Sequence, residues 1–301
     1  MNPTVSALQR SGEIQPGARQ RRVVPKFMKK KHSEMMDFER RQSASGIEKF
    51  LGFGPGTFDH IPHYAREEAL YALRKVRDWE RRHVFRSGLY YIVLSDLCRA
   101  TEASTVLGND LSKKRVETFI LTCVEALGRI DTTNYHLFLR EIGDAVLMLF
   151  SSFRDAHEWW FTMQSWLDGR NGMWASESDM SRSEFKHFKL EAKTIIHAGE
   201  VDYSDGKIPL SAAINQVFKI EKNFKGHELG ISEQALSCVR PVLRSLKLSP
   251  KLRGQVKLPG DNVMSRIYLA DDFGKHLKAK ERWYRKLMSE KTDFQFESEK
   301  S

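Results

Sequence analysis

Two aspartates stand at the ends of apolar runs in this chain of 301 residues. Asp96 follows the run YYIVLS, and Asp144 lies in a Gly-Asp pair between the runs LFLREI and AVLMLF. Runs rich in β-branched and aromatic residues are typical of buried strands, so each carboxylate is expected at the edge of one. A carboxylate there is costly unless a positive charge offsets it. Two of them close together would repel each other, which predicts that they share divalent metal.

The elements that must position these aspartates follow from hydrophobic periodicity. A helix with its N-cap at Ser112, whose apolar residues run from Val116 to Ile130, is predicted between the first two strands. The order of elements predicts an α+β fold, a sheet with helices on one face in ferredoxin-like style. The predicted strands are 90–95, 135–140, 145–150, 188–201 and 227–232, and the other predicted helices are 153–167, 208–222, 234–246 and 272–288.

Composition divides the chain into four predicted segments. Residues 1–60 are a basic, largely disordered segment, and 61–88 are a helical lead-in with an apolar stripe of Ala69, Leu73 and Val76. The sheet domain is expected at 89–246, and 247–301 form a basic C-terminal extension. Within the domain, 168–183 is rich in Gly, Ser and Asp and predicts a flexible insertion.

Charge and cysteine content limit the function classes. The net charge of +10 is concentrated at the two ends, which indicates solvated basic tails or an anionic partner. No apolar run approaches the roughly 18 residues of a membrane helix, and the N-terminus has no apolar signal core. Three scattered cysteines predict a reducing, cytoplasmic location without disulfide or zinc framework. The sequence contains no Gly-rich P-loop and no Ser-His-Asp pattern.

Five stretches between Leu89 and Leu236 carry a family resemblance. In chain order they are SDLCRATEAS, EIGDAVLMLF, TIIHAGEV, AAINQVFKIEK and GHELGISEQAL. Together they resemble the motifs of the class III nucleotidyl cyclases, the adenylate and guanylate type. The resemblance implies a ferredoxin-like cyclase domain in which the ribose 3′-hydroxyl of a nucleoside triphosphate attacks the α-phosphorus and diphosphate leaves.

The resemblance also assigns the metal and phosphate contacts. Two Mn²⁺ or Mg²⁺ ions per site would each touch Asp96 and Asp144, and the backbone carbonyl of Leu97 would reach one of them. The following residues would cradle the phosphates through backbone N–H groups as the chain enters a helix. These phosphate-binding residues are Cys98, Arg99, Ala100 and Thr101.

In the family the active site is built across a head-to-tail homodimer. By resemblance, Asn215 of one subunit would orient the ribose in the other subunit's site, and Lys219 would stabilise the charge that develops on the phosphates. The cation is usually an arginine in the family, and lysine keeps the charge without the bidentate fork. A catalytically inactive nucleotide binder therefore stays an alternative.

Base choice depends on two further positions. Adenylate-specific members carry a lysine four residues before the second aspartate and an acid seven residues before the asparagine, where this chain has Arg140 and Ile208. Ile208 cannot accept a hydrogen bond from adenine, and Arg140 only donates, which suits the carbonyl oxygens of uracil. UTP is therefore the predicted substrate, with CTP, ATP and GTP as alternatives.

The absence of purine-reading residues and the basic extensions make the chain similar to the pyrimidine cyclases of bacterial antiphage (Pycsar) systems. That likeness implies that cyclic UMP serves antiviral defence through a separate effector protein. A nucleic-acid-binding protein stays a further alternative. Nucleic acid is not the expected partner, because binding would need the tails and the Trp-rich helix to form one cationic and aromatic surface. His197 and Glu200 are assigned no catalytic role.

Overall fold

The structure is a computed structural model that describes residues 56–61, 63–82, 87–130, 136–177, 181–203, 211–260 and 264–279. All of these belong to one unit, Gln42–Ser301, and the second unit, Met1–Arg41, lies outside the described residues. Of the N-terminal segment predicted to be largely disordered, residues 56–60 are described and form a turn in which Phe58 is buried, and the rest lies outside the described residues. The end of the predicted helix 272–288 also lies outside them, although 273–279 is helical.

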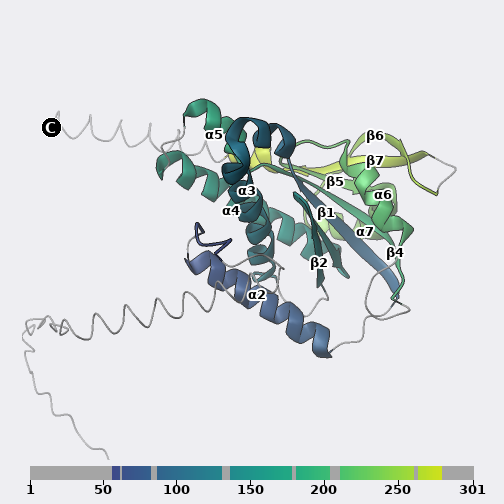
Figure 1. The fold of residues 1–301 in the computed structure, drawn as a ribbon. Helices are drawn as coiled ribbons and strands as arrows, with labels where there is room; N and C mark the ends of the chain where they lie inside the picture. The colour runs from purple at the N-terminus through teal and green to yellow at the C-terminus, as the bar shows by residue number, and fades with distance from the viewer. Residues whose placement is uncertain are drawn as a thin grey trace, which may run out of the picture. The chain divides into compact units, whose positions relative to one another are not determined.

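The centre of the fold is a sheet in which β1 lies between β3 and β4 (Figure 1). The order β2-β3-β1-β4, with every neighbouring pair antiparallel, is that of a ferredoxin-like sheet, so the predicted α+β fold is confirmed. The elements concerned are β1 (Gly88–Leu97), α3 (Ala100–Leu127), β2 (His136–Ile142), β3 (Ala145–Phe150), α4 (Phe153–Glu177) and β4 (Ala192–Val201).

The sheet continues on the far side of β4. Strand β5 (Glu228–Ser232) pairs parallel to β4, and β7 (Met264–Asp272) and β6 (Lys251–Lys257) follow as antiparallel neighbours. Helix α7 (Glu233–Ser245) connects β5 to β6. The sheet therefore extends past Leu246 into residues that composition assigned to a basic extension.

Helices cover both faces of the sheet, so the prediction of helices on one face is wrong. Helices α3, α4 and α7 pack in one apolar cluster with β1 residues such as Val93. Helix α6 (Ala212–Glu221) packs in a second cluster on the other face, where Val217 and Ile220 meet Ile92 and Leu94 of β1. Alternate residues of β1 are buried on opposite faces, which is why that strand reads as one continuous apolar run.

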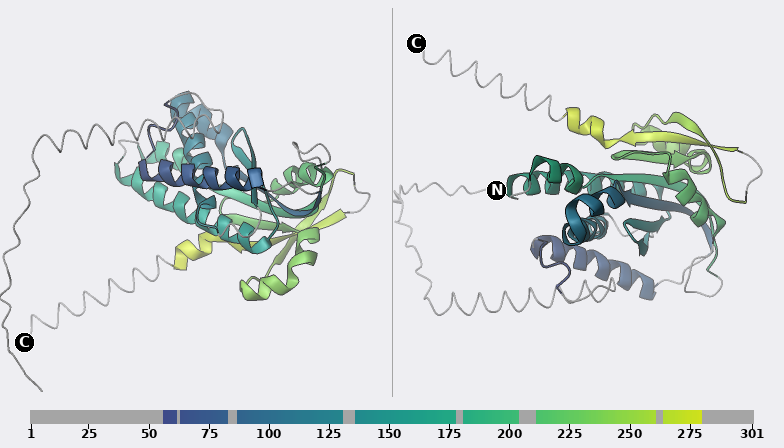
Figure 2. Two further views of the ribbon diagram at one scale, coloured as in Figure 1. Left: turned by 90° about the horizontal axis from the view of Figure 1, so that it is seen from below. Right: turned by 45° about the horizontal axis from the view of Figure 1, so that its top comes forward.

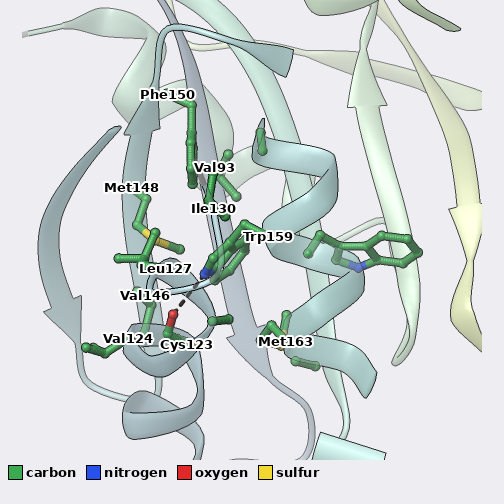
Figure 3. Packing of buried hydrophobic residues seen from close by; sticks show 14 of the residues in the cluster. Val93, Cys123, Val124, Leu127, Ile130, Val146, Met148, Phe150, Trp159 and Met163 are labelled. Carbon is green, nitrogen blue, oxygen red and sulfur yellow. Dashed lines mark hydrogen bonds between the residues drawn. The ribbon is translucent and has the colours of Figure 1, made fainter. Parts of the chain in front are cut away.

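Trp159 of α4 occupies the middle of the larger cluster (Figure 3). Its indole Nε1 donates to the carbonyl of Cys123 over 2.8 Å, so the only polar atom of a fully buried side chain is satisfied. Helix α2 (His63–Arg82) lies outside this layer against α3, and in the left view of Figure 2 it is in front. The predicted stripe of α2, which includes Ala69 and Leu73, is buried.

Helix α3 begins at Ala100, but Gly108, with φ +74° and ψ 172°, is not helical and divides α3 into two helices across a kink. The prediction missed the first of these helices, and the second begins before the predicted start at Ser112. The periodicity was interrupted there because glycine adopts this conformation freely and removes an apolar position from the pattern.

The predicted insertion at 168–183 is also wrong over most of its length. Helix α4 continues to Glu177, and α5 (Arg182–Phe188) begins with a capping box between Ser181 and Glu184. The side chain of Asn171 bonds the backbone of Leu190 in both directions, at 2.9 and 2.8 Å. Such tertiary contacts outweigh the low helix propensity of the two glycines in this segment.

Gly199 allows α6 to approach β4 closely. A Cβ built there would lie 2.2 Å from the Cβ of Ala213, a distance that no folded backbone tolerates. We expect Gly199→Ala to displace α6 and lower the free energy of unfolding by about 1–3 kcal/mol. Gly254→Ala, where no atom lies within 4 Å of the added Cβ, is the matched control. Urea denaturation of both variants measures the difference, and equal midpoints would contradict the close approach.

Candidate active site

Asp96 and Asp144 lie at the same end of the sheet. Asp96 is the last residue but one of β1 and pairs with Ala145, the residue that follows Asp144. The backbone N–H of Leu97 donates to the carbonyl of Asp144 over 3.1 Å. Main-chain pairing thus holds the two aspartates at neighbouring ends of adjacent strands, although 47 intervening residues separate them in the sequence.

The turn that carries Asp144 depends on Gly143. That residue has φ +65°, in the left-handed region, and lets β2 return as β3 within two residues. Asp144 itself is partly exposed, whereas the six residues of β3 after it are all buried. The carboxylate therefore lies where the apolar sheet opens to solvent.

Lys193 supplies the positive charge that Asp96 needs. The two residues are paired across β1 and β4, and Lys193 Nζ lies 3.1 Å from Asp96 Oδ2. The same ammonium group forms an ion pair with Glu221, which ends α6 and is buried. The bridge joins the end of β1 to the helix that carries Asn215 and Lys219.

Burial shifts the titration of both aspartates. Loss of hydration, and then the neighbouring Glu221, raise the pKa of Asp96 to about 6, against the opposing charge of Lys193. Burial, and then the charge of Asp96, raise the pKa of Asp144. The electrostatic coupling of the two carboxylates is a property expected of groups that bind a cation together.

The residues after Asp96 form a tight bend into α3. Arg99 adopts the left-handed conformation, with φ 61°, and no side chain caps the helix that starts at Ala100. A helix start without a side-chain cap leaves backbone N–H groups able to bind an anion. The bend is held from below by Arg115, whose Nη2 donates to the carbonyl of Cys98 over 2.6 Å.

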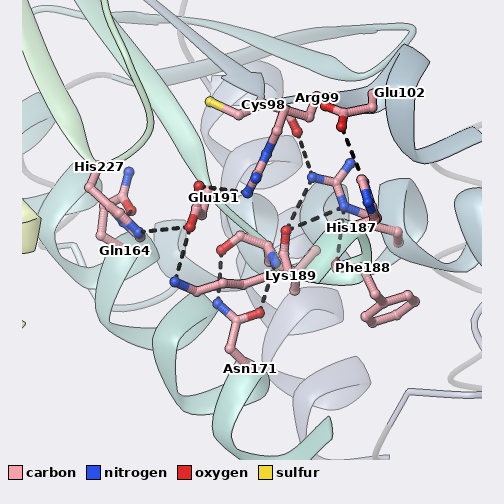
Figure 4. Close-up of polar contacts among 12 residues, drawn as sticks. Cys98, Arg99, Glu102, Gln164, Asn171, His187, Phe188, Lys189, Glu191 and His227 are labelled. Carbon is pink, nitrogen blue, oxygen red and sulfur yellow. Dashed lines mark hydrogen bonds and ion pairs between the residues drawn. The ribbon is translucent and has the colours of Figure 1, made fainter. Parts of the chain in front are cut away.

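Glu191 holds the outer side of the bend (Figure 4). It accepts from Arg99 Nη2 over 2.9 Å, pairs with Lys189 over 3.0 Å, and lies 3.8 Å from His227 Nε2. His227, and then Lys189 and Arg99, lower the pKa of Glu191 to about 2 despite its burial. The N–H of Cys98 donates to the carbonyl of Glu191 over 2.8 Å, so side chain and backbone fix the same bend.

Asn215 and Lys219 lie on the exposed side of α6, one turn apart. The opposite side of the helix is fastened to the sheet: Gln216 Oε1 and His197 Nε2 are 3.0 Å apart, and His197 Nδ1 is 2.8 Å from Ser232 Oγ. His197 is thus buried and hydrogen-bonded. Asn215 and Lys219 face away from their own subunit's core.

Two predicted substrate-binding residues are not described at the side-chain level. The backbone of Arg140 pairs with Leu147 in the β2–β3 hairpin, next to an irregularity in the register, but its side chain lies outside the described residues. Ile208 lies wholly outside them. The predicted base-reading pair therefore stays a prediction.

The donor set at the end of β1 fits a divalent cation such as Mg²⁺ or Mn²⁺. Carboxylate and carbonyl oxygens are the ligands these ions prefer, and Mg²⁺ is commonly held by one or two carboxylates together with substrate phosphates. The described part of the chain contains no group of three or more His, Cys, Asp or Glu side chains that could hold an ion.

Sequence reasoning missed Lys193, Glu221, Arg115 and Glu191. Lys193 was visible as the single cation at the start of the apolar strand 192–198, and Arg115 as a cation within the apolar stripe of α3. Arg115 is fully buried, and burial, and then the charge of Arg99, lower its pKa to about 10. No local pattern shows that Glu191 meets Arg99, because their contact joins segments far apart in the chain.

Comparison with known proteins gives structural likeness only. No protein-family profile matches the chain, and no curated protein matches its sequence. Among solved structures, the adenylyl cyclase CyaB from P. aeruginosa is 16% identical, with 62% of this chain and 97% of that chain covered and a TM-score of 0.46.

Two further solved structures match at the same level. The guanylyl cyclase Cya2 is 19% identical, with 62% and 94% covered and a TM-score of 0.46. The guanylate cyclase domain of RhGC from Catenaria anguillulae, in complex with GTP, is 12% identical, with 61% and 96% covered and a TM-score of 0.45. Likeness at this level assigns no activity to this chain.

None of the described helices is long and apolar enough to cross a membrane.

All three cysteines are free thiols, with Cys123 buried, Cys98 partly exposed and Cys238 exposed.

The raised pKa of Asp96 predicts a pH-dependent stability. Its ordinary pKa is 3.8 and its folded pKa is about 6, so the proton stabilises the folded state below about pH 4, and this contribution is lost as pH rises through about 6. We expect the unfolding free energy of wild type to fall by about 1–3 kcal/mol relative to Asp96→Asn across this window. Denaturant unfolding at a series of pH values measures the gap, with Glu158→Gln, an exposed position, as control. A gap that is constant with pH would contradict the burial of this charge.

Proposed function

We propose that the protein is a nucleotidyl cyclase, which converts a nucleoside triphosphate into a 3′,5′-cyclic nucleotide and diphosphate. The observation that carries the proposal is that β1 and β3 pair up to Asp96 and Ala145, so that Asp96 and Asp144 lie at one end of the sheet, beside the uncapped start of α3. Two neighbouring carboxylates next to the backbone N–H groups of a helix start suit a metal-bound triphosphate. The α+β architecture and the five family motifs support the same conclusion.

The residues at the end of β1 would bind the substrate's metal-bound phosphates. Bound Mn²⁺ or Mg²⁺, two ions per site, would favour ionisation of the 3′-hydroxyl and neutralise the triphosphate. Asp96, Asp144 and the carbonyl of Leu97 would hold these ions. The backbone N–H groups of residues 99–101 would donate to the phosphates. The N–H of Cys98 instead donates to the carbonyl of Glu191 and, together with Arg115, keeps the bend in shape.

Lys193 would also contact the substrate. Without substrate it offsets the charge of Asp96, and Glu221 holds it from the other side. Glu221 would keep the ammonium group of Lys193 in place, close enough to the end of β1 to bind a phosphate oxygen of a metal-bound substrate. Lys193 is thus a candidate substrate-binding residue in addition to those found from the sequence.

The active site would be shared between two subunits. Asn215 and Lys219 are exposed on α6 and point away from their own core, which suits residues that complete the partner's site. Asn215 would orient the ribose, and Lys219 would stabilise negative charge as diphosphate leaves. A head-to-tail homodimer would then contain two active sites.

UTP is the proposed substrate and cyclic UMP the product. Support comes from the residue types at Arg140, which offers only donors, and Ile208, which offers no acceptor to adenine. CTP is the next candidate, followed by ATP and GTP. We further propose a cytoplasmic role in antiphage defence, in which a separate effector protein binds the cyclic nucleotide.

Incubation with each of the four ribonucleoside triphosphates and Mn²⁺, with products identified by mass, tests this function. We expect cyclic UMP and diphosphate from wild type, and loss of product by at least about a hundredfold in Asp144→Ala, because one metal-binding carboxylate is removed. Glu158→Gln is the surface control. Triphosphate binding by calorimetry without any product would instead indicate an inactive nucleotide sensor.

Mixing two inactive variants tests the shared site. Asp96→Ala and Asn215→Ala should each be inactive alone, but a heterodimer would keep one intact site. Random exchange of subunits should then restore about one quarter of wild-type turnover. Mixing Asp96→Ala with Asp144→Ala is the matched control and should restore nothing, because both changes lie in the same half-site. Restoration in neither mixture would contradict sharing between subunits.

A further inference from the structure

A cationic surface lies at the opposite edge of the sheet from β2. Between Glu233 and Asp261 the sequence carries six lysines and arginines and no acidic residue. The structure exposes all six side chains, on α7, on the connection that follows it and on the edge strand β6. We call this the α7–β6 surface; its cations are Arg240, Arg244, Lys247, Lys251, Arg253 and Lys257.

The charge of this surface is largely uncompensated. Within the described part of the chain, Arg253 is the one member with a carboxylate at ion-pair distance, Glu228 at 3.3 Å. Arg240 and Arg244 are one helical turn apart, about 6 Å along the axis of α7. Like charges placed this closely repel each other unless an anion lies across them.

A small cavity gives the surface a concave centre. It has a volume of about 210 Å³, and its lining includes three lysines, Lys247, Lys251 and Lys275, together with Ser249. Lys275 lies 3.7 Å from Asp272 in an exposed ion pair, and Asp271, which also lines the cavity, lies 3.2 Å from His276 Nε2 and 3.6 Å from His157 Nε2. Lys247 and Lys251 have no carboxylate at ion-pair distance within the described residues, so the lining keeps an excess of positive charge that favours a phosphate group.

We propose that the α7–β6 surface binds the phosphate backbone of a duplex nucleic acid, with one phosphate in the lysine-lined cavity. Recognition would be independent of sequence, since exposed cations contact phosphates and no element enters a groove. The stretch from Glu233 to Asp261 contains no Phe, Tyr or Trp, so it lacks the stacking platform that single strands require. The sequence argument against nucleic acid concerned a different surface, one formed by the basic tails and the Trp-rich helix.

An anionic membrane fits the surface less well. Peripheral binding to lipid needs a band of exposed apolar residues beside the cations. Leu252, 61% exposed, is the one large apolar residue fully exposed on β6. The surface therefore offers charge without an apolar face to insert, which favours a polyanion in solution.

Salt-dependent binding of the full chain to short duplex DNA and duplex RNA, by fluorescence anisotropy, tests the proposal. The test variant is Lys247→Gln/Lys251→Gln/Lys275→Gln. The slope of log K against log salt changes by about one unit for each phosphate that the protein neutralises, so loss of the one phosphate in the cavity should lower the slope of the triple variant by about one unit. Its affinity should fall by about tenfold or more at moderate salt.

The matched control is Lys113→Gln/Lys114→Gln/Lys186→Gln, which removes the same charge from exposed positions on α3 and α5. It should keep the wild-type slope. An equal loss in both variants, or in neither, would overturn the proposal, because binding would then follow net charge or the terminal segments. Circular dichroism and thermal unfolding confirm that both variants are folded.

Two further binding measurements, with inorganic phosphate and with phosphatidylserine vesicles, identify the source of the phosphate. Lysine-dependent binding of inorganic phosphate without duplex binding would replace nucleic acid by a free anion. Lysine-dependent binding to phosphatidylserine vesicles without duplex binding would replace it by a membrane. Either result overturns the proposal. Cyclisation measured in parallel should be unchanged in the triple variant, so failure of the proposed enzymatic activity would be seen separately from failure of this surface.

Discussion

The structure around the candidate site depends on the cost of placing Asp96 at the end of a buried strand. Strand β1 is paired on both sides, so its last residues cannot move to solvent without breaking main-chain hydrogen bonds. Lys193 offsets the charge of Asp96: it pairs with this residue of β1 and with Glu221 of α6, and so connects the strand to the helix. One ammonium partner offsets only part of the cost of burying a carboxylate. The pKa of Asp96 therefore stays raised in spite of Lys193.

Helix α6 is fastened to the sheet on one side only. On its inner side Gln216 bonds His197 and Glu221 bonds Lys193, while Asn215 and Lys219 are exposed on its outer side. Under the proposed function, the same bridge that offsets the charge of Asp96 would also hold the helix that presents Asn215 and Lys219 to a partner subunit.

The layer of α3, α4 and α2 gives this site a rigid base. Arg115, fully buried in α3, donates from Nε to the carbonyl of Phe188 and from Nη2 to the carbonyls of Cys98 and Lys189, and so joins the bend after β1 to the end of α5. Burying a guanidinium group costs hydration free energy, which its hydrogen bonds to backbone carbonyls offset while they fix the backbone's shape. Behind it, the Trp159 cluster shown in Figure 3 fills the space between helices and sheet.

The sequence by itself determined the local features of this protein. Apolar periodicity located β1, the β2–β3 hairpin, β5 and α7, and the order of elements led to the ferredoxin-like sheet, because each of these signals lies within one short segment. It also placed Asp96 and Asp144 at strand ends. Local propensity failed for three features that depend on packing. They are the kinked start of α3, the glycine-containing end of α4, and the covering of the second face of the sheet by α6. Only the tertiary structure decided that Lys193 lies between Asp96 and Glu221, and that Lys247, Lys251 and Lys275 line one cavity, since no spacing rule connects these residues.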